Sequence, residues 1–79
     1  MKLINCSLEG EYEIVKIDQL SPVITARLTD LEVVVGNKLN VVRKGSKNAC
    51  VLLLINNRLI AVSYEVAEKI YVKLKGDND

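Results

Sequence analysis

The segment 21–36 constrains the fold more than any other part of the chain, because it combines the only proline with the clearest helical spacing. Ser21 is a good N-cap, and Pro22 suits the first position of a helix. Three apolar residues follow at helical intervals: Ile24, Leu28 and Leu31. This spacing predicts a short amphipathic helix of about two and a half turns. Gly36 then allows the chain to reverse direction into the next element.

The rest of the chain predicts strands around an aliphatic core. Hydrophobic residues make up 49% of the 79 residues, yet the only aromatic residues are three tyrosines, so the core must be built from aliphatic side chains. Val and Ile, which are abundant here, favour strands. A single helical turn is expected to begin after Ser63, a second good N-cap. The five expected strands are residues 11–18, 38–43, 49–55, 58–62 and 70–74.

Local patterns predict how these strands bend and connect. The apolar residues of the first strand change faces between Ile14 and Val15, which predicts a β-bulge. Residues 44–48 predict a polar hairpin loop. The pair Asn56–Asn57 predicts a two-residue turn, because asparagine tolerates positive φ. The segment 49–55 is apolar on both faces, which predicts a strand buried on both sides at the centre of the barrel.

Together these elements predict a mainly β fold. The expected architecture is a small SH3-like barrel of about five strands, with one short helix after the first strand and a helical turn before the last. Leu3, Ile4 and Leu8 in the lead-in are expected to plug one end of the barrel. A chain of this length forms one domain. We therefore predict a single domain over residues 1–75 and a flexible C-terminal tail at 76–79.

The chain carries a formal net charge of +1, but its charges are unevenly distributed. No acid occurs between Glu32 and Glu65, and this acid-free segment carries the basic residues Lys38, Arg43, Lys44, Lys47 and Arg58. Such a segment can meet phosphate or an acidic partner, or it can simply be solvated. Nucleic-acid binding through these residues is the less favoured reading, because the net charge is near zero and stacking aromatics are missing from the segment.

The sequence offers little for catalysis. There is no histidine, the commonest general base and metal ligand. Cys50 lies within an aliphatic strand, so we expect a buried, inert thiol. Cys6 lies in the lead-in and is expected to be partly exposed. A metal site at Cys6 with Glu9, or a disulfide between the cysteines, is not favoured, so we predict no enzyme activity, no cofactor and no metal site.

The location of the protein follows from its apolar runs. The first residues contain no apolar core of a signal peptide. The longest unbroken apolar run, residues 49–55, is far shorter than the roughly 18 residues that a membrane helix needs. We predict a cytoplasmic protein with reduced thiols that is not inserted into a membrane.

The connection after the helix is the best candidate for a binding surface. Three consecutive valines must run over the outside of the barrel, and all three cannot point inward. Either two pack on the barrel and one is tolerated in solvent, or they form an exposed contact patch. Tyr64 and Tyr71 are amphipathic side chains that suit interfaces. The predicted partner-binding residues are Arg27, Leu31, Val33, Val34, Val35 and Tyr64.

The order of these segments resembles the FeoA family, the small ferrous iron transport protein A. The resemblance covers residues 8–74, nearly the whole chain. It rests on the order and spacing of short motifs: Leu8-Glu9-Gly10, then residues 12–17, 26–31 and 36–43, and the closing 58–63.

Two positions depart from the family pattern, which has a glycine after the helix and a proline before the next glycine. Glu32 stands at the glycine position and Val35 at the proline position. If position 32 keeps a positive φ, a non-glycine residue there costs on the order of 1 kcal/mol.

The resemblance implies a cytoplasmic accessory or regulatory protein of ferrous iron uptake. It would act by protein–protein interaction with the cytosolic part of a FeoB-type membrane transporter, and weak self-association is compatible with such a role. Whether iron is bound directly stays open. The same barrel also occurs as the C-terminal domain of metal-dependent transcriptional repressors, so a detached domain of that type is the alternative.

Overall fold

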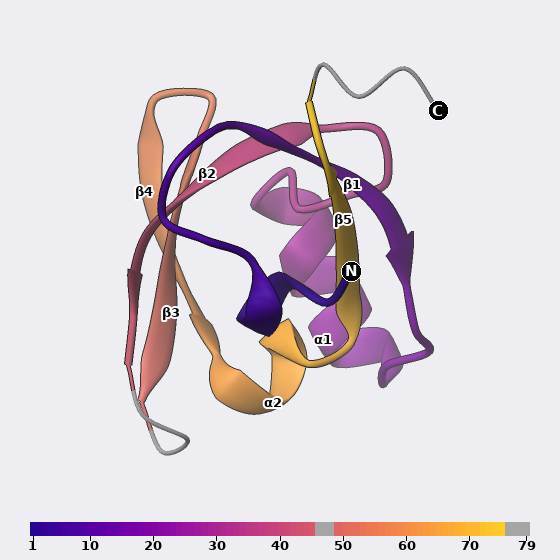
Figure 1. Ribbon diagram of the computed structural model, residues 1–79. Coiled ribbons are helices and arrows are strands. Elements are labelled where there is room, and N and C mark those ends of the chain that lie inside the picture. Colours follow the sequence, from indigo (N-terminus) through magenta and orange to yellow (C-terminus); the bar gives the residue numbers. More distant parts are fainter. Residues whose placement is uncertain (46–48, 76–79) are drawn as a thin grey trace.

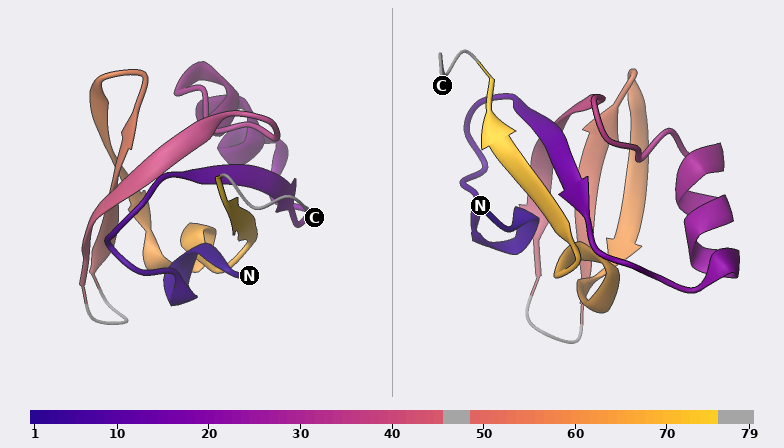
Figure 2. Two further views of the ribbon diagram at one scale, coloured as in Figure 1. Left: turned by 45° about the horizontal axis from the view of Figure 1, so that its top comes forward. Right: turned by 90° about the vertical axis from the view of Figure 1, so that its right-hand side faces the viewer.

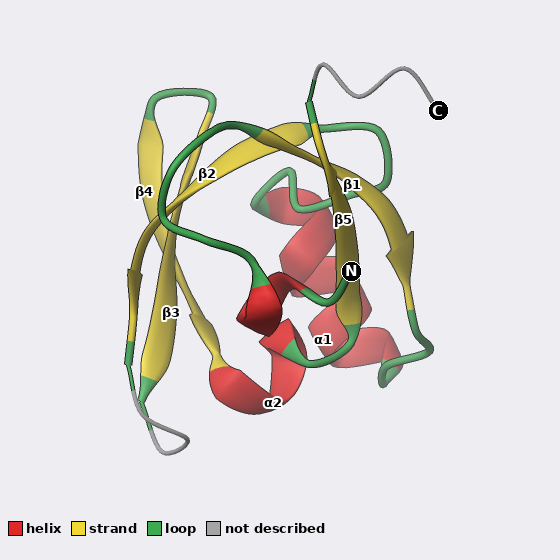
Figure 3. Cartoon of the chain, viewed as in Figure 1, coloured by secondary structure: helices red, strands yellow, loops and turns green. Residues whose placement is uncertain are grey.

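The chain folds into a small β-barrel, as its strand pattern predicts. A computed structural model describes residues 1–45 and 49–75. The elements in chain order are η1 (Leu3–Asn5), β1 (Tyr12–Ile17), α1 (Pro22–Asp30), β2 (Lys38–Lys44), β3 (Cys50–Ile55), β4 (Arg58–Ser63), α2 (Tyr64–Ala67) and β5 (Ile70–Leu74). The strands pair antiparallel in the order β4-β3-β2-β1-β5 (Figure 1 and Figure 3). The mainly β, SH3-like fold is confirmed, whereas the predicted tail at 76–79 and most of the predicted loop at 44–48 lie outside the described residues.

Two bulges let the sheet curl. The register between β1 and β5 shifts between Ile14 and Lys16, so the predicted bulge at Val15 is confirmed. A second shift falls between Val41 and Arg43 of β2. A bulge bends its strand and increases the local twist. As a result β2 pairs with β3 along one wall and reaches β1 on the other (Figure 1).

The inside of the barrel is aliphatic. Leu3 of η1 is fully buried, so its predicted role as an end plug is confirmed, and Ile4 is half-buried beside it. The prediction for Leu8 is wrong, because its side chain is 52% exposed. Leu8 lies in the exposed bend that leads to β1, where the Ser7 N–H donates to the Tyr12 hydroxyl at 3.1 Å.

Both cysteine predictions are also wrong. Cys50 is exposed, because β3 buries one face and turns the other outward; the strand is therefore not buried on both sides. Cys6 is buried at the C-terminal end of η1, where its thiol donates to the Leu3 carbonyl at 3.0 Å. The lead-in folds back over the core, and sequence spacing alone does not reveal that return.

The helices begin where their caps predict. The Ser21 hydroxyl accepts a hydrogen bond from the Ile24 N–H at 3.3 Å, with Pro22 at the first helical position. The Ser63 hydroxyl accepts one from the Val66 N–H at 3.2 Å. Asn56 and Asn57 form the turn between β3 and β4 with φ of 51° and 65°, as predicted.

Other segments lie beside both outermost strands, but within the described residues only the edge of β5 is paired through its main chain. α1 lies outside the barrel, alongside the edge of β4 (Figure 2). At the opposite edge, the Met1 amine donates to the Val72 carbonyl at 2.9 Å, and the Val72 N–H donates to the Met1 carbonyl at 2.8 Å. Covered edges are less available for pairing with other chains. The position of α1 also creates the grooves described next.

Candidate interaction surface

The end of α1 positions the connection that follows it. The Val33 N–H donates to the Leu28 carbonyl at 2.8 Å, and the Glu32 N–H donates to the Thr29 carbonyl at 3.0 Å. These two bonds form a Schellman motif, which normally has glycine in the left-handed conformation. Glu32 takes that place with a φ of 66°. The backbone therefore keeps the conformation that favours glycine although the residue is a glutamate.

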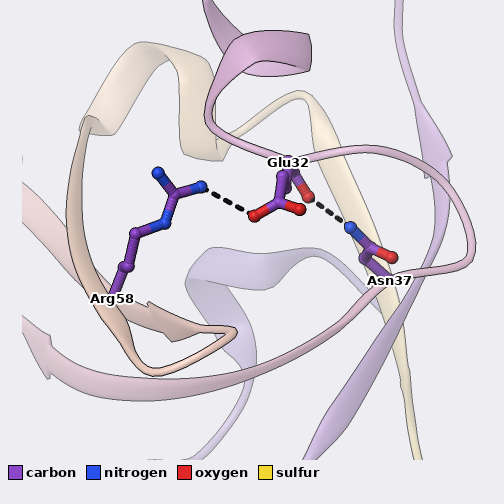
Figure 4. Close-up of polar contacts among 3 residues, drawn as sticks. All are labelled: Glu32, Asn37 and Arg58. Atoms are coloured by element: carbon purple, nitrogen blue, oxygen red, sulfur yellow. Dashed lines mark hydrogen bonds and ion pairs between the residues drawn. The ribbon is translucent and has the colours of Figure 1, made fainter.

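Glu32 is held by polar contacts from two other segments. Its carboxylate lies 2.7 Å from the Arg58 guanidinium at the start of β4, and its carbonyl accepts a hydrogen bond from the Asn37 side-chain amide at 2.7 Å (Figure 4). The Asn56 side-chain amide and the Arg58 guanidinium lower the pKa of the Glu32 carboxyl below its ordinary value of 4.5. These contacts tie the connection after α1 to the turn between β3 and β4.

The three valines of the connection have different environments. Val33 is buried, Val34 is half-buried, and Val35 is 58% exposed. Val33 alone belongs to the core, while Val34 and Val35 both line the valine groove described below. Val33 packs in the same core cluster as Leu28, which is the apolar contact that accompanies a Schellman motif.

Two open grooves lie on either side of α1. The first, here called the β4 groove, has a volume of about 220 Å³ and runs between α1 and the β4–α2 segment. The second, the valine groove, has a volume of about 280 Å³ and runs between α1, the end of β1 and the valine connection. Leu28 lines both. The helix thus stands between two largely apolar depressions.

The predicted partner-binding residues divide between these grooves. Arg27 and Leu31 line the β4 groove together with Ala61 of β4. Residues 33–35 line the valine groove. Tyr64 is half-buried at the start of α2 and lines neither.

Several groove residues were missed by sequence reasoning. Ile17 and Leu20 line the valine groove, and Val66 lines the β4 groove. Each belongs to a recognisable apolar pattern, but nothing in those patterns says that it faces α1.

The side chain of Tyr71 contacts two charged residues of the same molecule. Its hydroxyl donates to the Asp18 carboxylate at 3.1 Å, and the Lys16 ammonium lies 5.1 Å from the centre of its ring. Lys16 also lies 3.5 Å from the same carboxylate. These contacts explain why an outward-facing tyrosine is half-buried.

Two of the basic residues singled out above also serve the fold. The Lys44 ammonium donates to the carbonyls of Cys6 and Ile4, and Arg58 pairs with Glu32. Lys38 and Arg43 are exposed on β2, and Lys47 lies outside the described residues.

The two thiols were considered above as candidate metal ligands or disulfide partners. Burial raises the pKa of the Cys6 thiol, and the Lys44 ammonium opposes that rise in part. Cys6 and Cys50 are both free. Within residues 1–45 and 49–75, no group of three or more His, Cys, Asp or Glu side chains is placed to hold a metal ion. No helix in this part of the chain has the length and apolar character needed to cross a bilayer.

Comparison with known proteins identifies the family. The family model described as the FeoA domain matches residues 1–74. The chain belongs to the FeoA family. The barrel, the helix after β1 and the connection 32–36 are thus features of a FeoA domain.

Solved structures agree with this FeoA assignment. The NMR structure of FeoA protein from Chlorobium tepidum is 26% identical, with a TM-score of 0.84, and the match covers 100% of this chain and 74% of that one. Iron(II) transport protein A from Clostridium thermocellum is 21% identical, with a TM-score of 0.83 over 96% of this chain and 46% of that one. A manganese-dependent transcriptional repressor shares the fold at 14% identity, with a TM-score of 0.83 over 94% of this chain and 41% of that one. No curated protein gives a significant match.

Proposed function

We propose that this FeoA-family protein is a cytoplasmic, non-enzymatic accessory protein of ferrous iron uptake. It acts by docking onto the cytosolic part of a FeoB-type membrane transporter. The family assignment over residues 1–74 supports the link to iron uptake. The single structural observation that carries the docking role is the pair of grooves flanking α1, each lined mainly by apolar side chains on a rigid barrel.

Docking would bury apolar surface while a charge sets the orientation. Leu31 and Val35 offer apolar surface on opposite sides of α1, and Arg27 places a cation at the rim of the β4 groove. An apolar centre with a charged rim is typical of transient protein interfaces. The nucleic-acid alternative has less support, because Lys44 and Arg58 already bind groups within the protein.

The test measures binding of the purified protein to the purified cytosolic part of such a transporter by isothermal calorimetry. Arg27→Glu probes the β4 groove and Val35→Asp probes the valine groove; Val35 is preferred to Val34 because Val34 is half-buried. Lys73→Glu on the exposed face of β5 is the matched control. We expect at least one groove variant to weaken binding about tenfold or more, with the control unchanged. Wild-type affinity in both groove variants would exclude these grooves as the contact surface, and no binding by the wild type would exclude the docking role.

A further inference from the structure

The wall formed by β2, β3 and β4 has a second face that points away from the core. Strand register places its outward side chains in rows across the three strands. Leu54 lies between Asn40 and Leu59. Leu52 lies between Arg43 and Ala61 in the next row, and Val42 protrudes at the bulge between the rows. We call Val42, Arg43, Leu52, Leu54, Leu59 and Ala61 the outer sheet face.

The outer sheet face is unusually apolar for an exposed surface. Leu59 is 62% exposed, Val42 47% and Leu54 37%. Leu54 and Leu59 are direct cross-strand neighbours, so their side chains adjoin. The described helices lie behind this wall or along the edge of β4, and β1 and β5 form the opposite wall (Figure 1 and Figure 2). A contiguous apolar patch of this kind marks a contact site more often than scattered exposed residues do.

The charged side chains of β2, β3 and β4 are all basic, although Glu13 of β1 is the cross-strand partner of Lys38. β2, β3 and β4 contain no Asp or Glu. Arg43 lies on the face and Lys38 lies at the start of β2; both are exposed, and within the described residues neither takes part in an ion pair. The cations follow β2, so the face has an apolar centre with a positive flank on one side.

A polar hollow adjoins the apolar centre. A groove of about 330 Å³ is lined by Leu54 and Lys38 together with Glu11, Asn40, Asn56 and Asn57. Leu54 belongs to both the groove and the outer sheet face, so the two are continuous. The Asn40 amide already donates to the Gly10 carbonyl at 2.9 Å, and the Asn56 amide contacts Glu32. The hollow therefore adds polar surface next to the apolar centre of the face.

We propose that the outer sheet face binds an acidic amphipathic segment of a partner protein. The apolar stripe of that segment covers Leu54 and Leu59, and its carboxylates face Arg43 and Lys38. Ala61 belongs both to this face and to the β4 groove, but Leu54 and Leu59 line neither groove beside α1, so the proposal does not depend on the proposed function.

Charge argues against the other occupants. In a symmetric contact between two copies of this face, Arg43 and Lys38 would find no carboxylate on β2, β3 or β4 of the other copy. An anionic bilayer typically attracts clusters of roughly four to eight basic residues, whereas this face offers two.

The test uses a helical peptide of about 16 residues with leucines along one face and glutamates along the other. A control peptide has the same leucines and lysines in place of the glutamates. Nitrogen-15-labelled full-length protein is titrated with each, and the shifted backbone amides are mapped. We expect the acidic peptide to shift amides of β2, β3 and β4 and to bind about tenfold or more tightly than the basic peptide, an advantage that falls in high salt.

Variants locate the site. Combined Lys38→Glu and Arg43→Glu should reverse the preference between the two peptides, and Leu59→Ser should weaken both. Leu59 is largely exposed, so that change leaves the core intact, and Lys73→Glu on β5 is the control. Equal affinity for the two peptides, or shifts confined to the grooves beside α1, would overturn the proposal. Two further results would overturn it. One is a protein that does not bind the acidic peptide but binds phosphatidylserine vesicles, and the other is a dimer that Leu59→Ser dissociates.

Discussion

The carboxylate of Glu32 lies 2.7 Å from the guanidinium of Arg58, although the two residues are 26 positions apart in the chain. Glu32 ends α1 in a left-handed conformation, and Arg58 begins β4. The contact therefore joins the connection after the helix to the barrel wall beside which the helix lies. It gives a glutamate a local role at a position where a glycine would relieve backbone strain.

The strain and the ion pair can be separated by two substitutions. Glu32→Ala removes the ion pair but keeps a Cβ in the left-handed region, so the backbone strain stays. Glu32→Gly removes both the ion pair and the backbone strain. A non-glycine residue in that region costs on the order of 1 kcal/mol, so we expect Glu32→Gly to be more stable than Glu32→Ala by about that amount. Urea denaturation of both variants measures the difference. Equal stabilities would show that the backbone at position 32 is not strained.

The stability that Glu32 contributes should depend on pH. Its folded-state pKa is lowered below 4.5 by the Asn56 amide and the Arg58 guanidinium. A lowered folded pKa stabilises the fold fully above the ordinary pKa, and the contribution is lost as the pH falls through the folded pKa. Glu32→Gln should therefore be less stable than the wild type near pH 7, and the deficit should shrink as the pH falls below 4.5 and through the lowered folded pKa. A deficit that is the same at both pH values would contradict the pairing. Because the ion pair is exposed, high salt should also reduce the stability deficit of Glu32→Gln.

The two thiols should differ in reactivity. Cys50 is exposed on β3, whereas Cys6 is buried and its pKa is raised by that burial. Since the thiolate is the reactive form, we expect iodoacetamide to label Cys50 rapidly and Cys6 slowly in the folded protein. Mass spectrometry of digested, time-quenched samples measures both rates. Similar rates for both thiols in the wild type would contradict the burial of Cys6.

The attachment of α1 should depend on one side chain. Leu28 is 5% exposed and is the buried residue of the helix, while Val35 is 58% exposed in the connection after it. Leu28→Ala should destabilise the protein by about 2–4 kcal/mol, because it leaves a cavity beneath the helix. Val35→Ala should change stability by less than about 0.5 kcal/mol. Hydrogen exchange should show amides of α1 losing protection in Leu28→Ala before amides of β3 do. Uniform loss across the chain would mean that the helix and the barrel unfold together.

Local sequence signals predicted the elements of this fold closely. Ser21 and Ser63 each satisfy a backbone N–H of the helix that they precede, so the helix starts are encoded within a few residues. The Asn56–Asn57 turn and the bulge at Val15 are likewise short-range features. The glycine position that Glu32 occupies was recognised from the family pattern, and its left-handed backbone is confirmed.

What sequence reasoning could not supply is the environment of each surface residue. Cys6 is buried although it was expected to be partly exposed, and Cys50 is exposed although it was expected to be buried. Burial depends on which distant segment packs over a position. The predicted contact residues lie on two sides of α1, because the helix stands between β1 and β4.

The segment 21–36 shows the same division. Its sequence alone determined a capped helix, an apolar face and a turn at Gly36, since each rests on neighbours within about one helical turn. Only the tertiary structure decided that Arg58 holds Glu32, that two grooves flank the helix, and that Leu54 and Leu59 face outward from β3 and β4. Those features join residues far apart in the chain, and they exist only once the sheet has closed.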